Sequence, residues 1–415
     1  MADPGKLLYL VGQFPAINHT YILEEVKLLR NLGFDISIAS VSPPDRPVEE
    51  MNEEERDETA RTYYIKSLPV AQMVLLSLTE FVQHPVSCLR GLFFAVQLGG
   101  SSVRQIAYHL AYFAEAVLVG RYMRQRGIRH VHANFSATVS LIATRVFPVT
   151  MSFVAHGYGE LHDPKSTHLA ERIKGSLFVR AVSRHGRGQM MLSSEREDWS
   201  KLIYCPLGID VSKYLPAPAR HGPSSPTVLC VGRLAPEKGQ EILLDAVAAL
   251  RASGRSLKLR LVGDGPDRSF LERKAEELGI AASVEFDGWV DPARLPEVYA
   301  EADICVLSSL AEGIPIVLME AMAMQVACVA PRITGIPELI EHGFDGLLFA
   351  VADAEDLSRQ IQRLLDSPDL RLQIGQAGRA RVLREYDIVQ NTKCFAAVLA
   401  AQLSPTNQQN SRHTS

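Results

Sequence analysis

Short apolar runs alternate with helix-period segments along most of the chain. This alternation is typical of βαβ units, in which helices join parallel strands. In the first half, the runs predicted as strands are Leu7–Phe14, Ile36–Val41, His130–Phe135, Met151–Ala155 and Leu177–Val182. In the more regular second half, they are Thr227–Val231, Leu257–Val262, Ser283–Phe286, Ile304–Leu307, Val326–Ala330 and Leu347–Phe349. The pattern predicts an α/β protein with two Rossmann-like, doubly wound domains, whose strand ends would meet at one ligand cleft.

Two segments depart from this alternation. Residues 68–126 form long helix-period runs rich in Phe, Leu and Val, which predict a helical insertion in the first domain. Its arginines would offer a surface to an anionic or lipid-linked molecule, or a peripheral contact with a membrane, whereas ordinary packed helices are the alternative. These arginines are Arg90, Arg104, Arg121, Arg124 and Arg126. The stretch Asp45–Ala60, DRPVEEMNEEERDETA, is predicted as an acidic, solvated loop or short helix.

The domain boundaries follow from composition. Residues 1–205 are predicted as the first domain and residues 206–386 as the second, with a Pro/Gly/Ser-rich linker at the end of Cys205–Pro226. One more helix is expected within residues 387–403. The polar tail 404–415, SPTNQQNSRHTS, is predicted to be disordered.

Composition narrows the class of protein. The 415 residues are 47% hydrophobic and 22% charged, which is ordinary for a soluble globular protein of two or three domains. The net charge of −4 disfavours a nucleic-acid binder, which would need a basic stripe. The six cysteines form no C-x-x-C pair, so disulfides and a metal site are disfavoured and a reducing, cytoplasmic location is expected. No apolar stretch reaches about 18 residues, and KLLYLVGQF is interpreted as a buried strand, not as a signal peptide.

The stretch SSLAEGIPIVLMEAMAMQVACVAP, residues 308–331, holds two carboxylates, Glu312 and Glu320. It leaves a predicted strand, and Pro315 suits the first position of a helix whose free amides would bind an anion. Glu312 would lie beside that anion, and Glu320, on the second turn, would accept hydrogen bonds from a polyol such as ribose. The alternative is that Glu320 pairs with a local arginine and that Glu312 is a surface loop residue.

Two further strand exits favour the binding interpretation. VGRLAPEKG, residues 231–239, places Gly232, Arg233 and Lys238 at the end of a strand, and LVGDGPD adds Gly263. An arginine fork and a lysine point charge suit a diphosphate. Together with the predicted helix end, these exits describe a nucleotide-diphosphate site.

These motifs resemble the retaining glycosyltransferases of family four, which have the GT-B fold. SSLAEGIPIVLMEAMA is similar to the E-x7-E signature. Four other segments resemble motifs of the family and have the family's order and spacing: VGRLAPEKG, LVGDGP, FDGWV and TGIPELIEHGFDGLLF. VHANFSATVS, FVAHGYGE and FPAINHTYILEEVKLL resemble segments of the subgroup that builds bacterial exopolysaccharides. The chain departs from the family at Gln325, usually Gly, at Cys328, usually Pro, and at Gly159, usually Asp.

The resemblance implies roles for individual residues. Glu320 would hold the donor's ribose, Glu312 would contact the transferred sugar, and Arg233 and Lys238 would neutralise the leaving diphosphate. Further donor contacts are implied at Gly232, Gly263, Gly288, Trp289, Val290, Gly313, Ile314, Pro315, Ile316 and Val317. Acceptor-side roles are implied for Gly12, His19, Asn134 and His156; His156 would face the reacting sugar, unless it is a structural histidine.

The function expected from this resemblance is transfer of a sugar, with retention, from a UDP- or GDP-sugar to a glycan, lipid-linked or small-molecule acceptor. The terminal helix would return to the first domain, as it does across this fold. No metal is expected, because the chain contains no Asp-x-Asp pair to grip one. A nucleotide-sugar 2-epimerase on the same fold and a non-catalytic nucleotide- or glycan-binding module are the alternatives. The enzyme is expected in the cytoplasm or at the inner face of a membrane.

Overall fold

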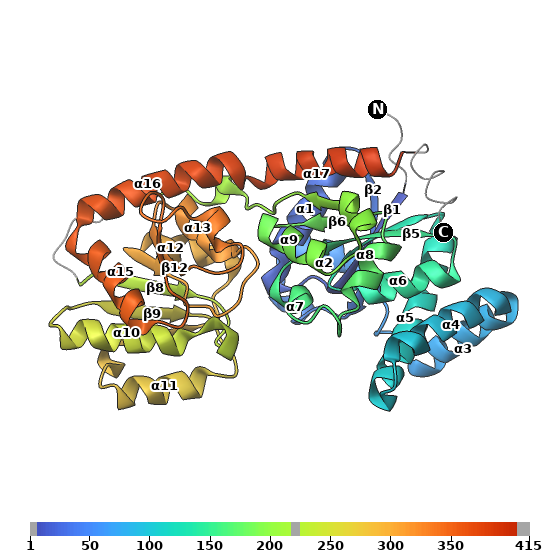
Figure 1. Cartoon of the computed structure of the whole chain (residues 1–415), viewed down its shortest axis with the longest axis horizontal. Helices are drawn as coiled ribbons and strands as arrows, with labels where there is room; N and C mark the ends of the chain where they lie inside the picture. The colour runs from blue at the N-terminus through green and yellow to red at the C-terminus, as the bar shows by residue number, and fades with distance from the viewer. Residues whose placement is uncertain (1–5, 217–224, 405–415) are drawn as a thin grey trace. The chain divides into compact units, whose positions relative to one another are not determined.

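The structure is a computed structural model that describes residues 6–216 and 225–404 (Figure 1). The chain forms two compact units. Unit 1 comprises the chain up to Val182, Gly186–Cys205 and the chain from Thr392 onward, and unit 2 comprises Ser183–His185 and Pro206–Asn391. The greater part of the predicted linker (217–224) and of the predicted disordered tail (405–415) lies outside the described residues.

Unit 1 is built on a parallel sheet in the order β3-β2-β1-β4-β5-β6-β7. In the register of the central strands, Leu7 lies opposite Ile36 on one side and His130 on the other. The strands are β1 (Lys6–Gln13), β2 (Asp35–Ser42), β3 (Tyr63–Tyr64), β4 (His130–Asn134), β5 (Thr150–Ala155), β6 (Phe178–Ala181) and β7 (Leu202–Tyr204). The central strands β1, β4 and β5 are buried along most of their length because helices cover both faces of the sheet. The edge strands β3 and β7 were not predicted, because two or three residues are too short to show a period.

The helices of unit 1 fall into two groups. Those that accompany the sheet are α1 (Thr20–Asn31), α2 (Glu53–Arg61), α6 (Ala137–Val146), α7 (Tyr158–Leu161) and α8 (Leu169–Gly175), followed by α9 (Arg184–Leu192), which starts in unit 2. The segment predicted as an insertion forms α3 (Val70–Gln83), α4 (Pro85–Gly99) and α5 (Val103–Arg126), which lie side by side at one edge of unit 1 (Figure 1). Gly127, with φ 68°, ends α5.

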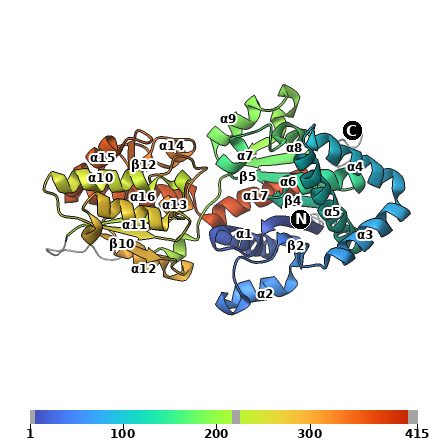
Figure 2. The ribbon, with the colours of Figure 1, turned by 90° about the horizontal axis from the view of Figure 1, so that it is seen from below.

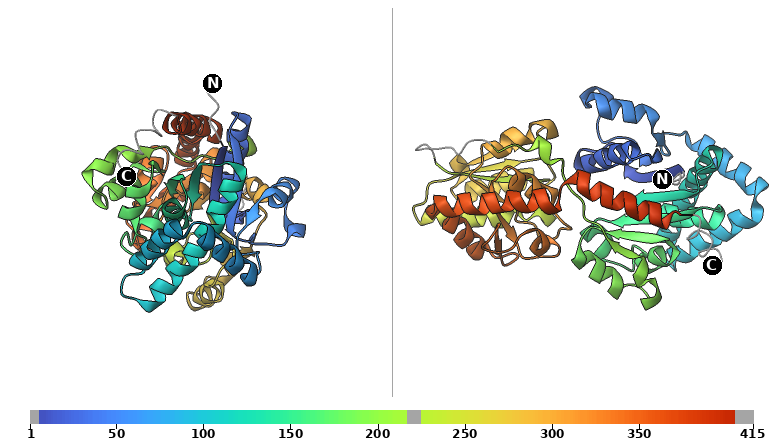
Figure 3. Two further views of the ribbon diagram at one scale, coloured as in Figure 1. Left: turned by 90° about the vertical axis from the view of Figure 1, so that its right-hand side faces the viewer. Right: turned by 90° about the horizontal axis from the view of Figure 1, so that it is seen from above.

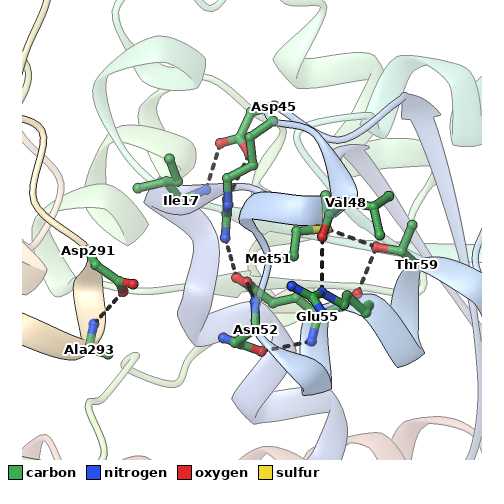
Figure 4. Close-up of polar contacts among 11 residues, drawn as sticks. Ile17, Asp45, Val48, Met51, Asn52, Glu55, Thr59, Asp291 and Ala293 are labelled. Carbon is green, nitrogen blue, oxygen red and sulfur yellow. Dashed lines mark hydrogen bonds and ion pairs between the residues drawn. The ribbon is translucent and has the colours of Figure 1, made fainter.

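The acidic stretch before Ala60 is only partly solvated, which corrects the prediction. It forms α2, which lies next to α1 (Figure 2) and begins with a capping box in which Asn52 and Glu55 bond each other's backbone amides. Glu55 and Glu58 are buried. Glu55 is 2.6 Å from Arg46, and Glu58 is 2.6 Å from Arg30 (Figure 4 shows Glu55 in its contacts). The two arginines compensate the charges of the buried carboxylates. Neither arginine is adjacent in sequence to the glutamate that it pairs with.

Unit 2 contains a second parallel sheet, in the order β10-β9-β8-β11-β12-β13. Its strands are β8 (Thr227–Val231), β9 (Lys258–Val262), β10 (Val284–Gly288), β11 (Ile304–Val306), β12 (Ala327–Pro331) and β13 (Leu347–Phe349). Its helices are α10 (Gln240–Ala252), α11 (Arg268–Glu277), α12 (Leu295–Ala300), α13 (Ile316–Ala323), α14 (Ile336–Leu339), α15 (Ala354–Asp366) and α16 (Pro368–Glu385). Two parallel sheets with helices confirm the predicted fold class.

The alternation of side chains along β8 shows why unit 2 is doubly wound. Leu229 and Val231 belong to the apolar core that also holds residues of α13 and α16. Val228 and Cys230 point to the other core, which α10 and α15 complete. Since successive residues of a strand face opposite sides, a fully apolar strand needs helices on both.

The last helix, α17 (Ile388–Gln402), crosses from unit 2 into unit 1 at Thr392. Phe395 and Leu399 are fully buried in the unit 1 core that contains Tyr9 and Phe178. The Phe395 ring lies 5.1 Å from the His132 ring. The right-hand view of Figure 3 shows α17, in red, against the unit 1 strands.

We predict that Phe395→Ala lowers the free energy of unfolding of the full-length protein by about 3–5 kcal/mol, the usual cost of truncating a buried phenylalanine. Val389→Ala on the same helix, at a position that is 37% exposed, is the matched control and should cost well under half as much. Urea unfolding followed by circular dichroism measures both. Equal losses in the two variants would show that α17 does not anchor on unit 1.

Candidate functional site

The donor-side residues lie at one edge of the unit 2 sheet. The strands β10, β9, β8 and β11 are neighbours and run parallel, so their carboxyl ends meet at that edge. The exits are Gly288 at the end of β10, Gly263 after β9, Gly232 after β8 and Ser308 after β11. The order of strands therefore brings together motifs that are up to about 80 residues apart in the chain.

Glycines let these exits pack backbone against backbone. Gly263 has φ +131°, and a Cβ there would lie 2.1 Å from the carbonyl oxygen of Gly232. Gly239 has φ +59°, and its Cβ would lie 2.4 Å from the Ser308 oxygen. Side chains at these two positions would force the exits of β8, β9 and β11 apart.

Lys238 and Glu312 form an ion pair between two of these exits. Lys238 Nζ is 2.6 Å from Glu312 Oε1, and the Ser309 hydroxyl donates to the same oxygen over 2.7 Å. The Ser308 hydroxyl donates to the Lys238 carbonyl over 3.0 Å, so the β8 exit and the β11 exit are fastened together. The sequence assigned Lys238 to a diphosphate and Glu312 to a sugar, and the structure brings these two groups into contact with each other. Glu312 is therefore not a free surface residue.

The other donor-side residues lie at the same sheet edge as this pair, Arg233 after β8 and Trp289 and Val290 after β10. Arg233 is exposed, and the structure gives its side chain no ion-pair partner among the described residues. Trp289 is 47% exposed, and Val290 packs against the core that holds α13. An arginine and a lysine thus leave the same strand, and only the lysine is already paired.

The helix after Glu312 is shorter than predicted. It spans Ile316–Ala323, and Pro315, with ψ 120°, is its N-cap and not its first helical residue. Gly313 and Ile314 precede it, and the carbonyl oxygen of Gly313 would lie 2.6 Å from a Cβ at Gly335. The first-turn amides of this helix keep the free donors and the partial positive charge that the prediction required.

Glu320 has two tyrosines as partners and no arginine among the described residues. The Tyr214 hydroxyl donates to Oε1 over 2.7 Å and the Tyr299 hydroxyl donates to Oε2 over 2.8 Å. Glu320 is only 8% exposed. The alternative that it pairs with a local arginine is wrong. Neither tyrosine was singled out from the sequence, since Tyr214 lies before the first strand of unit 2 and Tyr299 on the short helix α12.

Burial raises the pKa of the Glu320 carboxyl above its usual range, and the two hydroxyl donors only partly oppose this shift. A carboxylate has about four acceptor positions, of which the tyrosines use two. Glu320 therefore keeps capacity for a hydroxyl ligand.

The four acceptor-side residues of unit 1 converge around one aromatic ring, that of Phe135. His19 stacks on it at 4.5 Å between centroids, and His156 stacks on it at 4.2 Å. A Cβ at Gly12 would lie 3.3 Å from the Phe135 Cβ. Asn134 Oδ1 is 2.9 Å from His156 Nε2. Phe135 lies in the quoted motif VHANFSATVS but was not predicted to organise the others.

His156 is held on both ring nitrogens. Its Nδ1 is 3.3 Å from the Tyr21 hydroxyl, in addition to the Asn134 contact at Nε2. Burial lowers the pKa of His156 well below its usual range, with further contributions from His19 and Arg180, so the ring is neutral at physiological pH. Both nitrogens of this neutral imidazole are already in hydrogen-bond contacts. The ring would have to release Tyr21 or Asn134 before it could contact a sugar. Tyr21 is a site candidate that the sequence did not indicate.

The described part of the chain has neither a metal-binding cluster nor a membrane-spanning helix. No group of three or more His, Cys, Asp or Glu residues there is arranged to hold a metal ion. No helix within 6–216 or 225–404 is both long enough and apolar enough to cross a membrane.

The fold and the donor-side edge define a two-domain glycosyltransferase of the GT-B type. Residues 215–381 match the family "Glycosyl transferases group 1", and this part of the chain is a domain of that family. The match covers the whole donor-side edge, including the two carboxylates, Glu312 and Glu320. The chain is therefore a glycosyltransferase.

Known proteins resemble the chain over most of its length. It is 25% identical over 409 residues to the amylovoran biosynthesis glycosyltransferase AmsK of Erwinia amylovora, covering 92% of this chain and 96% of that one. It is 28% identical over 291 residues to the GDP-mannose-dependent alpha-(1-6)-phosphatidylinositol monomannoside mannosyltransferase of Mycobacterium tuberculosis, covering 65% and 75%. The crystal structure of Anabaena HepE in complex with UDP has a TM-score of 0.70 at 18% identity, covering 95% and 100%.

We predict that Glu320→Gln changes how stability depends on pH. Because the folded state raises the pKa of Glu320, the folded protein holds this proton more tightly than the unfolded chain. Its ionisation therefore costs stability as pH rises above about 4.3, the usual glutamate value. The glutamine variant cannot ionise, and its amide can bond both tyrosine hydroxyls. Its free energy of unfolding, relative to the wild type, should thus rise from about pH 4 to pH 7.

Urea unfolding at both pH values measures this difference. Glu355→Gln, at an exposed position, is the control for loss of one carboxylate. If the Glu320→Gln difference stays constant with pH, Glu320 does not titrate differently in the folded state.

Proposed function

We propose that this glycosyltransferase moves a hexose from a UDP- or GDP-sugar to a hydroxyl of a sugar-containing or lipid-linked acceptor, with retention at the anomeric carbon. The observation that carries the donor side is the Lys238–Glu312 pair beside Arg233, at the carboxyl edge of the unit 2 sheet. The names of the relatives support a nucleotide sugar, since one uses GDP-mannose and a structural neighbour was crystallised with UDP. They leave the base and the sugar open.

The leaving diphosphate sets the electrostatic requirement. Negative charge grows on it as the bond to the sugar breaks, so groups that are already in place to meet that charge lower the barrier. An ammonium has three donors, and Lys238 uses one on Glu312, which leaves two for phosphate oxygens. Arg233 adds a planar fork. The first amides of α13 complete the set.

Glu320 would bind the ribose through its remaining acceptor positions. Tyr214 and Tyr299 fix both carboxylate oxygens, so the group would be oriented before the donor arrives. Glu312, held by Lys238 and Ser309, would face the hydroxyls of the transferred sugar. Retention would place the acceptor on the same face of the sugar as the leaving phosphate, which would help to deprotonate it.

The acceptor would meet the His19–Phe135–His156 cluster of unit 1. Its stacked rings suit the apolar face of a sugar, and Asn134 has a buried side-chain nitrogen with no hydrogen-bond partner among residues 6–216 and 225–404. An amide donor left unbonded in this way suits a hydroxyl ligand. We place the enzyme in the cytoplasm, at the inner face of a membrane, where a lipid-linked acceptor would be presented.

We predict that Lys238→Ala and Arg233→Ala each reduce kcat by roughly 100- to 1000-fold, the range seen when one group that stabilises transition-state charge is lost. KM for the acceptor should change much less. Lys258→Ala is the matched control, because Lys258 begins β9 at the amino edge of the same sheet. Steady-state kinetics with a UDP- or GDP-sugar distinguish the cases. A loss confined to acceptor KM would move both cations out of the donor site.

We also predict that catalysis needs no divalent metal. Arg233, Lys238 and the N-terminal dipole of α13 supply positive charge to a diphosphate from groups that are already fixed in place. Turnover should therefore survive excess EDTA. If EDTA abolished turnover and Mg²⁺ or Mn²⁺ restored it, the proposed roles of these cations would be wrong.

A further inference from the structure

The helical hairpin α3–α4 carries apolar side chains that are more than half exposed. On α3 they recur every fourth residue, at Val70, Val74, Leu78 and Val82, and so lie on one stripe. At the turn between the helices, Val82 is 82% exposed and Val86 is 80% exposed. The other exposed apolar residues of the hairpin are Leu75, Leu89 and Phe93.

These side chains are not a poorly packed core. The other side of α3 supplies Met73, Leu76 and Phe81, which pack against the unit 1 core. Helix α3 is therefore apolar on two sides, and the fold uses only one of them. Exposed apolar surface of this extent on consecutive turns marks an interaction site.

The charges of the same segment identify the kind of partner. Residues 68–126 contain five arginines and two glutamates, whereas the whole chain has a net charge of −4. Both glutamates are buried, and Glu80 is bonded to Arg121 and Arg124. The arginines that remain exposed are Arg90, Arg104, Arg124 and Arg126. The segment thus presents apolar and cationic groups to solvent, with no exposed carboxylate among its own residues.

We propose that the α3–α4 hairpin docks on an anionic lipid bilayer, with the valines at its turn inserted among the lipids and the arginines near the headgroups. Apolar insertion together with cationic attraction is what interfacial helices need. With 14 and 15 residues, α3 and α4 are too short to span a bilayer, so the contact would stay in one leaflet. A second copy of this chain fits less well, because it would bring arginines against arginines.

This surface does not depend on the donor site. Its test therefore uses the full-length protein and binding alone, with vesicles of phosphatidylcholine and vesicles in which part of it is replaced by phosphatidylglycerol. Co-sedimentation should show stronger binding to the anionic vesicles, and high salt should weaken that binding. Val82→Ser/Val86→Ser should reduce it by at least about tenfold, since two exposed valines lose their apolar insertion.

Leu192→Ser is the matched control, because Leu192 is an 83% exposed apolar residue of α9, outside the hairpin. It should bind vesicles like the wild type. Unchanged melting curves show that both variants fold. Equal binding of the wild type and the double variant, or equal binding to both kinds of vesicle, would overturn the proposal. So would a wild-type dimer in sedimentation velocity that the double variant breaks up, without vesicle binding, because that result would assign the hairpin to self-association.

Discussion

A buried carboxylate needs a partner that compensates its charge, and unit 1 depends on one buried ion pair of this kind. Glu25 of α1 is bonded to Arg180 of β6 and accepts a hydrogen bond from the Tyr9 hydroxyl of β1 over 3.0 Å. Arg180 donates onward to the Cys205 carbonyl over 3.0 Å and lies 4.2 Å from the centroid of the Phe395 ring. One ion pair therefore joins two strands, a helix and the returning α17. Loss of either charge would break this buried ion pair, which is far costlier than loss of a surface pair.

Most other buried acidic side chains also have a cationic partner that compensates their charge. Glu320 differs from them because it has none among its hydrogen-bond partners. Glu55, Glu58 and Glu80 each have an arginine. Glu320 has two neutral hydroxyls, which satisfy its hydrogen bonds but not its charge. Burial consequently raises its pKa. A carboxylate kept in this state within a domain of a glycosyltransferase family is typical of a ligand site, because structural acids are usually neutralised.

The donor side was predictable because local sequence builds it. Each exit follows an apolar strand, and parallel strands bring their exits to one edge. The contacts among side chains were not predictable, since Tyr214 is 106 residues from Glu320 and Lys238 is 74 residues from Glu312. The structure explains why glycine is usual in the family at one position where this chain differs. Gln325 stands at that position and has φ +60° just after α13, a conformation that glycine adopts without strain.

The acceptor side resists prediction for a different reason, which is that side chains and one strained residue build it. Phe135 has φ +63°, a left-handed conformation that a bulky residue rarely adopts. Two features hold it there: the rings of His19 and His156 stack on its side chain, and Gly12 leaves room for its Cβ. Such strain persists only when the surroundings over-determine it, and it gathers at functional sites. The strained backbone places the aromatic cluster of His19, Phe135 and His156 at the end of β4. That arrangement is visible only after the strands carrying Gly12, Asn134 and His156 have been brought side by side.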